Sequence, residues 1–142
     1  MRLFAITACA VLLVGCNPDG VQVDAKTSDF LSMFNCPVAS GTYQPVAIAN
    51  LIANPALFEG KPVEISGYHI SSFEHSAIYP TRQEPFSASF SEGVWTLIST
   101  DRNVSSEDRV TLRGIYTTKI RGHLGQWPGS ICVHSVRPGN EA

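Results

Sequence analysis

The chain has 142 residues, with 10 Lys and Arg against 12 Asp and Glu, so its formal net charge is −2. Hydrophobic residues make up 44% of the chain and charged residues only 15%. This composition excludes a disordered chain, a collagen-like chain and a strongly basic nucleic-acid-binding protein. The length is that of one domain, or of one small domain with a tail.

The most specific feature of the sequence is its N-terminus. A short basic start, Met1-Arg2, precedes an uninterrupted run of apolar and small residues from Leu3 to Val14. As a helix this run would be about 18 Å long, which is typical of a signal peptide and too short to cross a bilayer. The run ends in Leu13-Val14-Gly15-Cys16, which resembles the lipobox of bacterial lipoproteins. The alternative is an ordinary secretory signal that happens to carry a Cys.

The lipobox resemblance implies a signal peptide at residues 1–15 and a lipidated Cys16, whose acyl chains, palmitate among them, anchor the mature chain to the membrane. Asn17 follows the Cys, whereas an Asp there would resemble an inner-membrane retention signal. We therefore expect the protein in the cell envelope, at the outer membrane facing the periplasm if the organism has two membranes.

Two of the four cysteines remain once Cys9 leaves with the signal and Cys16 is lipidated. An exported protein with two remaining cysteines most simply forms one disulfide, which predicts a Cys36–Cys132 bond with a structural role. A bond that closes such a long loop is expected to stabilise the fold by about 4–5 kcal/mol. The alternative is two buried free thiols.

The first part of the mature chain is predicted to be a polar spacer followed by short helical turns. Ser28 is the expected cap of the first turn, and Asn54-Pro55 separates two later ones. In chain order the predictions are a spacer at 17–28, a helical turn at 29–34, a loop at 39–44 and helical turns between 45 and 60.

From Lys61 onward the apolar residues alternate with polar ones, as in strands. Gly67 and Gly114 interrupt the first and fourth strands and favour a bulge or bend there. The pattern favours a mainly β fold, a small five-stranded OB-like barrel, although a sandwich fragment or an SH3-like barrel fits the spacing almost as well. The five predicted strands are 63–68, 77–79, 94–99, 109–117 and 131–136.

We divide the chain accordingly. The expected units are the signal peptide at 1–15, the lipidated Cys with tether and helical segment at 16–44, the barrel at 45–138 and a tail at 139–142.

Three segments carry a further similarity: Asn50-Leu51-Ile52-Ala53-Asn54-Pro55, Phe58-Glu59-Gly60-Lys61-Pro62-Val63, and above all Gly122-His123-Leu124-Gly125-Gln126-Trp127-Pro128-Gly129. Over about residues 45–137 the chain resembles a family of small, largely uncharacterised bacterial proteins with an OB-like barrel. The resemblance implies the barrel fold and implies nothing about a mechanism.

The sequence lacks the motifs of most familiar enzymes. It has no P-loop, no dinucleotide fingerprint, no G-x-S-x-G, no C-x-x-C and no H-E-x-x-H. We therefore expect no catalytic residue, no metal and no cofactor.

In an OB-like barrel, the loop after the first strand and the loop between the fourth and fifth strands border one binding face. We expect a polar and aromatic cluster on that face. The alternative is that the polar residues bond the loop backbone while the aromatic residues fill the end of the barrel. The candidate binding residues are Tyr68, Glu74, Tyr79, Tyr116, His123 and Trp127.

A metal site formed by His69, Glu74, His75 and His123 is a weaker alternative, because two of these histidines are separated by only a short turn. His134 is predicted to be an ordinary half-exposed strand residue.

Charge is unevenly distributed along the chain, with five basic and no acidic residues in 109–140. A basic strand with Arg109 and Arg113 on one face is typical of oligonucleotide-binding barrels, but an exported protein meets little nucleic acid. We expect no nucleic-acid partner. The alternatives are a solvated sheet face, or contact with an acidic protein or anionic lipid.

The leading functional hypothesis is a lipid-anchored, non-enzymatic binding or scaffold module for a protein or glycan partner in the envelope. One alternative is a metal- or acid/base-dependent hydrolase in which Glu74 works with His75 or His123. Another is an inhibitor or immunity-type protein that inserts its 123–127 loop into an envelope enzyme.

Overall fold

The computed structural model describes residues 17–84, 86–100, 102, 104–105 and 108–139. The predicted signal peptide and the predicted lipidation site Cys16 lie outside these residues. Within the described ranges, no helix is long and apolar enough to cross a membrane.

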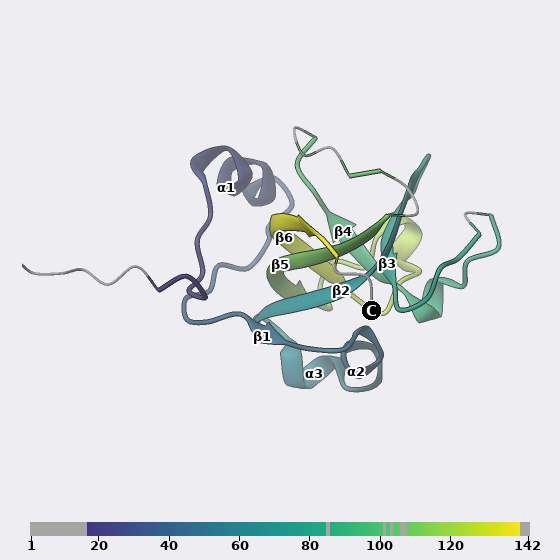
Figure 1. Cartoon of the computed structure of the whole chain (residues 1–142), viewed down its shortest axis with the longest axis horizontal. Coiled ribbons are helices and arrows are strands. Elements are labelled where there is room, and N and C mark those ends of the chain that lie inside the picture. Colours follow the sequence, from purple (N-terminus) through teal and green to yellow (C-terminus); the bar gives the residue numbers. More distant parts are fainter. Residues whose placement is uncertain (1–16, 85, 101, 103, 106–107, 140–142) are drawn as a thin grey trace, which may run out of the picture.

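Five strands close into a barrel (Figure 1). They follow one another around it in the order β2-β3-β4-β6-β5, and β2 pairs with β5 to complete the closure. The pair β4–β6 is parallel and the other barrel pairs are antiparallel. This confirms the predicted mainly β, five-stranded OB-like barrel. The strands are β2 (Pro62–Ser72), β3 (His75–Tyr79), β4 (Val94–Leu97), β5 (Arg109–Thr117) and β6 (Ser130–Pro138).

The two interrupted strands are irregular at their glycines. Strand β2 pairs with β5 up to Tyr68 and with β3 from Tyr68 onward, so it changes partner beside Gly67. Strand β5 shifts its register with β6 between Arg113 and Gly114. A Cβ at Gly114 would lie 2.2 Å from the carbonyl oxygen of Cys132, so the close approach of β5 to β6 requires glycine there.

The main core fills the barrel from alternate strand residues and from one helix. In β5, Val110 and Leu112 are buried while Thr111 between them is partly exposed, as the two-residue period of a strand requires. Helix α2 (Ile48–Ala53) adds Ile48 and Leu51 to this core. The other members are Val63, Ile65, Ile78, Val94, Tyr116, Ile131 and Val133.

The helices follow the prediction in part. Asn54-Pro55 separates α2 from α3 (Pro55–Phe58) as expected. Helix α1 (Ala25–Ser32) begins before the predicted turn, and Ser28 is not its cap. The Asp24 carboxylate instead accepts hydrogen bonds from the backbone N–H and the hydroxyl of Thr27, both at 2.9 Å.

Three short elements lie in segments where no regular structure was predicted. Strand β1 (Gln44–Pro45) pairs parallel with β2, at the end of the predicted loop. Two 3₁₀ turns lie between barrel strands: η1 (Phe90–Glu92) precedes β4, and η2 (His123–Gly125) precedes β6.

Residues 17–24, which we call the N-terminal arm, were predicted as part of a spacer but lie against the barrel. The Val21 N–H donates to the Gly41 carbonyl at 2.8 Å, and the Tyr43 N–H donates to the Asp19 carbonyl at 3.1 Å. The Arg113 guanidinium on β5 donates to the Asp19 carboxylate and to the Pro18 carbonyl, both at 3.2 Å. The arm is therefore fixed by its backbone as well as by charge.

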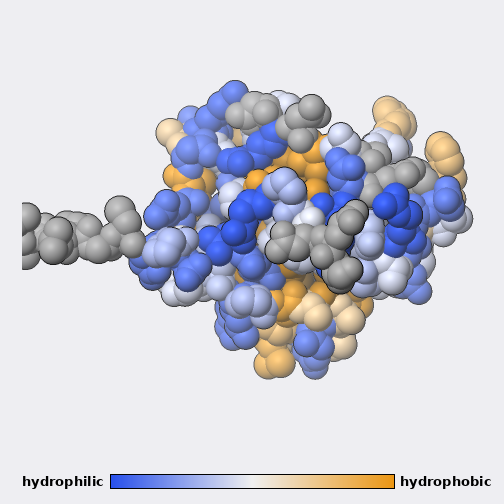
Figure 2. Space-filling view, in the orientation of Figure 1, coloured by the Kyte–Doolittle hydropathy of each residue, from blue (hydrophilic) through white to orange (hydrophobic). Residues whose placement is uncertain are grey.

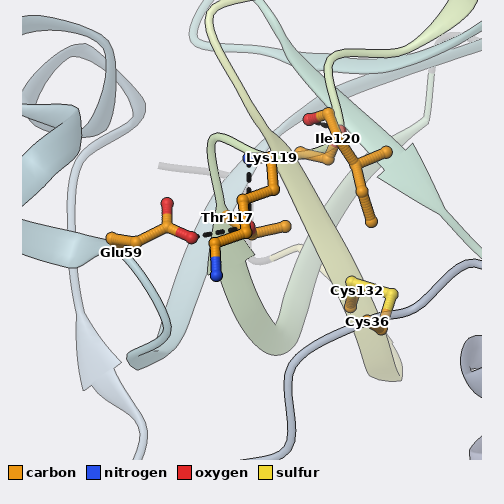
Figure 3. Close-up of a disulfide and its surroundings, with 7 residues drawn as sticks. Cys36, Glu59, Thr117, Lys119, Ile120 and Cys132 are labelled. Atoms are coloured by element: carbon orange, nitrogen blue, oxygen red, sulfur yellow. Dashed lines mark hydrogen bonds between the residues drawn. A yellow bond between two sulfur atoms is a disulfide. The ribbon is translucent and has the colours of Figure 1, made fainter.

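A disulfide joins Cys36, in the segment after α1, to Cys132 on β6, as predicted (Figure 3). The two Cα atoms are 6.1 Å apart. Cys132 is fully buried beside Leu31 of α1, Leu97 and Ile115, which form a second small core. The disulfide thus fastens the α1 segment to the outside of the barrel.

Candidate functional site

Two loops meet at one end of the barrel. The β2–β3 turn carries Glu74 and the β5–β6 loop carries His123. The Nε2 atom of His123 lies 3.3 Å from Oε2 of Glu74, and both side chains are partly exposed. The structure therefore brings these two candidate binding residues together at the surface.

The β2–β3 connection is a two-residue hairpin turn, because Ser72 pairs with His75. Phe73 and Glu74 stand at its tip, and the Phe73 side chain is 91% exposed. Glu74 has φ 57°, in the left-handed region that glycine or asparagine usually occupies. A glycine there would relieve the backbone, so retaining a glutamate is consistent with a role for its side chain.

Two hydrogen bonds between Arg121 and Trp127 join the two ends of the β5–β6 loop. The Arg121 Nε donates to the Trp127 carbonyl at 2.8 Å, and the Trp127 N–H donates to the Arg121 carbonyl at 3.1 Å. Gly122 has φ 70°, and a Cβ there would lie 2.7 Å from the rings of both Trp127 and Trp95. Leu124 stands at the tip with φ 54° and a side chain that is 78% exposed.

Beneath the two loops lies an aromatic cluster of His75, Tyr79, Phe90, Trp95 and Trp127. Ring centroids of Phe90, Trp95 and His75 lie 4.5, 4.6 and 5.3 Å from that of Trp127. Trp127 and Tyr79 are fully buried in this cluster. These two candidate residues therefore support the loops from below and do not form part of the surface.

Two polar side chains of the cluster, His75 and Tyr79, are paired with each other. His75 Nε2 lies 3.0 Å from the Tyr79 hydroxyl. Burial lowers the pKa of His75, and burial together with the charge of Glu92 raises the pKa of Tyr79. Both groups are therefore neutral at neutral pH. In the hydrolase alternative Glu74 is thus placed to work with His123, since the His75 Nε2 is engaged by Tyr79.

The other two candidate tyrosines lie apart from the Glu74–His123 pair. Tyr116 is fully buried in the main core, and burial raises its pKa to about 12. Tyr68 is partly exposed where β2 changes partner, with the Arg82 guanidinium carbon 5.2 Å from its ring centroid. Strand alternation places Tyr116 inward, on the same side of β5 as Val110 and Leu112.

The residues of the metal-site alternative are not arranged as ligands. His69 is buried, with its Nε2 3.0 Å from the Thr96 hydroxyl, and burial together with the nearby His75 lowers its pKa to about 4. In the part of the chain that the structure describes, no group of three or more His, Cys, Asp or Glu residues is placed to hold a metal ion.

His134 is buried, and the prediction of a half-exposed strand residue is wrong. Its Nδ1 lies 2.7 Å from the Tyr43 hydroxyl, and burial and the charge of Arg102 lower its pKa to about 4. The arm residues Gln22, Val23 and Asp24 line the same hollow as Tyr43 and His134, so the segment that precedes the barrel covers this strand.

Two arginines of the basic segment 109–140, Arg113 and Arg137, are paired within the molecule. Glu64 Oε2 accepts from the Arg113 Nε at 2.5 Å and from an Arg137 terminal nitrogen at 2.6 Å. Arg113 also contacts Asp19 at 3.2 Å. This network offsets the charge of two of the five basic residues, which favours a solvated sheet face over an anion-binding one.

The exposed apolar side chains of this end were not anticipated. Phe73 and Leu124 flank Glu74 and His123 in the sequence, and Phe86 and Phe90 of the β3–β4 loop are also exposed. Isolated apolar residues in polar loops have no periodic signal, so only the geometry reveals them. Figure 2 shows apolar atoms that project at the upper right of the molecule. We call Phe73, Glu74, His123 and Leu124 the loop surface.

In the comparisons with known proteins, no family model matched this chain and no curated protein matched it significantly.

Proposed function

We propose that this protein is a non-enzymatic binding module whose loop surface contacts a partner protein. The observation that carries the proposal is the exposure of Phe73 and Leu124, each next in sequence to one member of the Glu74–His123 pair. Apolar anchors beside polar groups on a rigid support are typical of the energetic centre of protein interfaces.

A protein partner fits this surface better than a glycan. Sugar rings stack on exposed aromatic faces, but Trp127 and Tyr79 are fully buried here. The loop surface itself consists of one exposed phenyl ring, one aliphatic side chain and one carboxylate–imidazole pair. The buried aromatic cluster holds these groups in place before a partner arrives, which lowers the entropic cost of binding.

We also propose that the protein works in the cell envelope, anchored by lipid on Cys16 after removal of residues 1–15. The lipobox-like Leu13-Val14-Gly15-Cys16 supports this, as does the disulfide, since structural disulfides persist in oxidising compartments.

The proposal is tested by site-specific photo-crosslinking in the native organism. A benzophenone amino acid at Phe73 or Leu124 is expected to give a discrete adduct with one protein. Leu57 on α3, which is also well exposed, is the matched control and should give no such adduct. The same adducts at all three positions, or none at Phe73 and Leu124, would overturn the proposal.

A further inference from the structure

The large exposed apolar side chains fall into two main groups in the described part of the chain. One group is at the loop end, with Phe73 and Leu124. The other lies on the N-terminal arm, on the end of α1 and on the segment that follows it. In Figure 2, apolar atoms also project at the upper left, over the α1 side. We call this second group, Val23, Met33, Phe34 and Val38, the α1 surface.

The α1 surface is held in place and remains uncovered. Val38 is 97% exposed and Met33 is 71% exposed. Val23 and Val38 line one shallow hollow of about 170 Å³ between the arm and the segment after α1. The Cys36–Cys132 disulfide lies within this segment and fastens it to β6. The fold therefore holds the Met33 and Val38 side chains at the surface, on a segment fixed by the disulfide.

The arm limits how far the start of the mature chain can be from this surface. Asp19 is bonded to Tyr43 and Arg113, so the chain is fixed to the barrel from that residue onward. Three residues of extended chain span at most about 11 Å, and this is the separation in sequence between Cys16 and Asp19. A lipid on Cys16 would thus hold the barrel directly at the bilayer, without a flexible spacer.

We infer that the α1 surface rests on the lipid bilayer as a second membrane contact, and that the loop surface faces away from it. The inference rests on the proposed lipidation of Cys16. Apolar side chains at a membrane interface sink into the boundary between headgroups and acyl chains, and a second contact strengthens an acyl anchor. The short reach from Cys16 identifies the bilayer as the occupant of this surface.

The orientation of the barrel on the bilayer follows from the positions of the two surfaces at opposite ends of the molecule. In Figure 1, α1 and the purple beginning of the described chain lie at the left, and the β3–β4 loop and η2 lie at the right, along the longest axis. A barrel that rests on its α1 side therefore presents the loop surface to the periplasmic space, where a partner protein can reach it.

Methyl NMR tests the contact directly. The chain has two methionines, Met1 and Met33, so the mature protein has a single methionine methyl signal, from Met33. Acylated protein carrying a labelled methionine methyl is placed in nanodiscs of phosphatidylethanolamine and phosphatidylglycerol, with and without a paramagnetic lipid. The variant Leu124→Met adds a matched reporter at the opposite end.

The paramagnetic lipid is expected to broaden the Met33 signal severalfold and to leave the signal at position 124 sharp. Mass spectrometry first establishes that Cys16 is acylated. In such protein, equal broadening of the two methyl signals, or no broadening of either, would overturn the inference and leave the anchor in place. A chain without acyl mass on Cys16 would overturn the anchor itself, and the inference with it.

Discussion

At the residue scale, burial separates the side chains that can bind a partner from those that hold the site together. Glu74 and His123 are partly exposed and 3.3 Å apart, whereas Trp127 is fully buried among aromatic rings beneath them. His123 and Trp127 come from the same loop, so their roles differ through the direction of their side chains. Substitutions can therefore distinguish the two roles.

Trp127→Ala is expected to lower the free energy of unfolding by about 3–5 kcal/mol, because it leaves a large cavity in the aromatic cluster. His123→Ala should cost less than about 1 kcal/mol, since a partly exposed polar contact of this kind contributes little. Urea denaturation of both variants checks this difference. A Trp127→Ala protein as stable as the wild type would contradict the supporting role of the indole.

Stability should also depend on pH through two buried histidines. The pKa values of His69 and His134 are lowered to about 4, so the unfolded state binds more protons than the folded state between pH 4 and about 6.5. Stability is then full above about pH 6.5 and falls as the pH drops toward 4, by up to about 3 kcal/mol for each histidine. Urea denaturation at neutral and at acidic pH measures the loss. The double variant His69→Gln/His134→Gln should lose less stability at acidic pH than the wild type. An equal loss of stability in the variant and the wild type would contradict this assignment.

At the element scale, the structure is a barrel with an attached N-terminal unit. The arm and α1 are joined to β5 and β6 by the Cys36–Cys132 disulfide, by hydrogen bonds and by the Arg113–Asp19 ion pair. The disulfide spans 96 residues of chain and therefore restricts the unfolded state over most of the barrel.

Reduction of the disulfide is expected to lower the free energy of unfolding by about 4–5 kcal/mol, the value for a loop of this length. Chemical denaturation with and without a reductant measures the effect. The Cys36→Ala variant serves as the control, because its stability should not respond to the reductant. An unchanged midpoint for the wild type after complete reduction would contradict a stabilising role.

The barrel could be predicted because apolar and polar residues alternate along its strands with a period of two. Glycines also occur where β2 and β5 are irregular. Strand β1 was missed because it has two residues, one of them a proline, and takes its pairing from β2. The docking of the arm was missed for a related reason. Its bonds at Val21 and Tyr43 are made by the backbone, which has no sequence signal.

The candidate site could be predicted only in part. Glu74 and His123 were identified because the fold class brings their two loops together. Tyr79, Tyr116 and Trp127 were candidate binding residues, but all three are buried, and for Tyr79 and Trp127 this matches the alternative in which they fill the end of the barrel. Loop and strand aromatics do not reveal from the sequence which way they point. Phe73 and Leu124 were not identified at all, since single apolar residues at loop tips resemble ordinary loop sequence.

At the scale of the whole molecule, two apolar ends define how the protein is proposed to work. The α1 surface and the arm lie at one end, and the loop surface lies at the other (Figure 1). Two of the five basic residues in 109–140, Arg113 and Arg137, are paired within the molecule through Glu64. In this proposal the barrel is a rigid spacer between the bilayer and a bound protein.

The most direct measurement is the affinity of this protein for the partner that is crosslinked through Phe73. The double variant Phe73→Ser/Leu124→Ser is predicted to weaken the Kd at least about 30-fold, as expected for the loss of two interface anchors. The matched control Leu57→Ser should bind like the wild type, and all three proteins should unfold at the same urea concentration. An unchanged Kd for the double variant would contradict the proposal that the loop surface binds the partner.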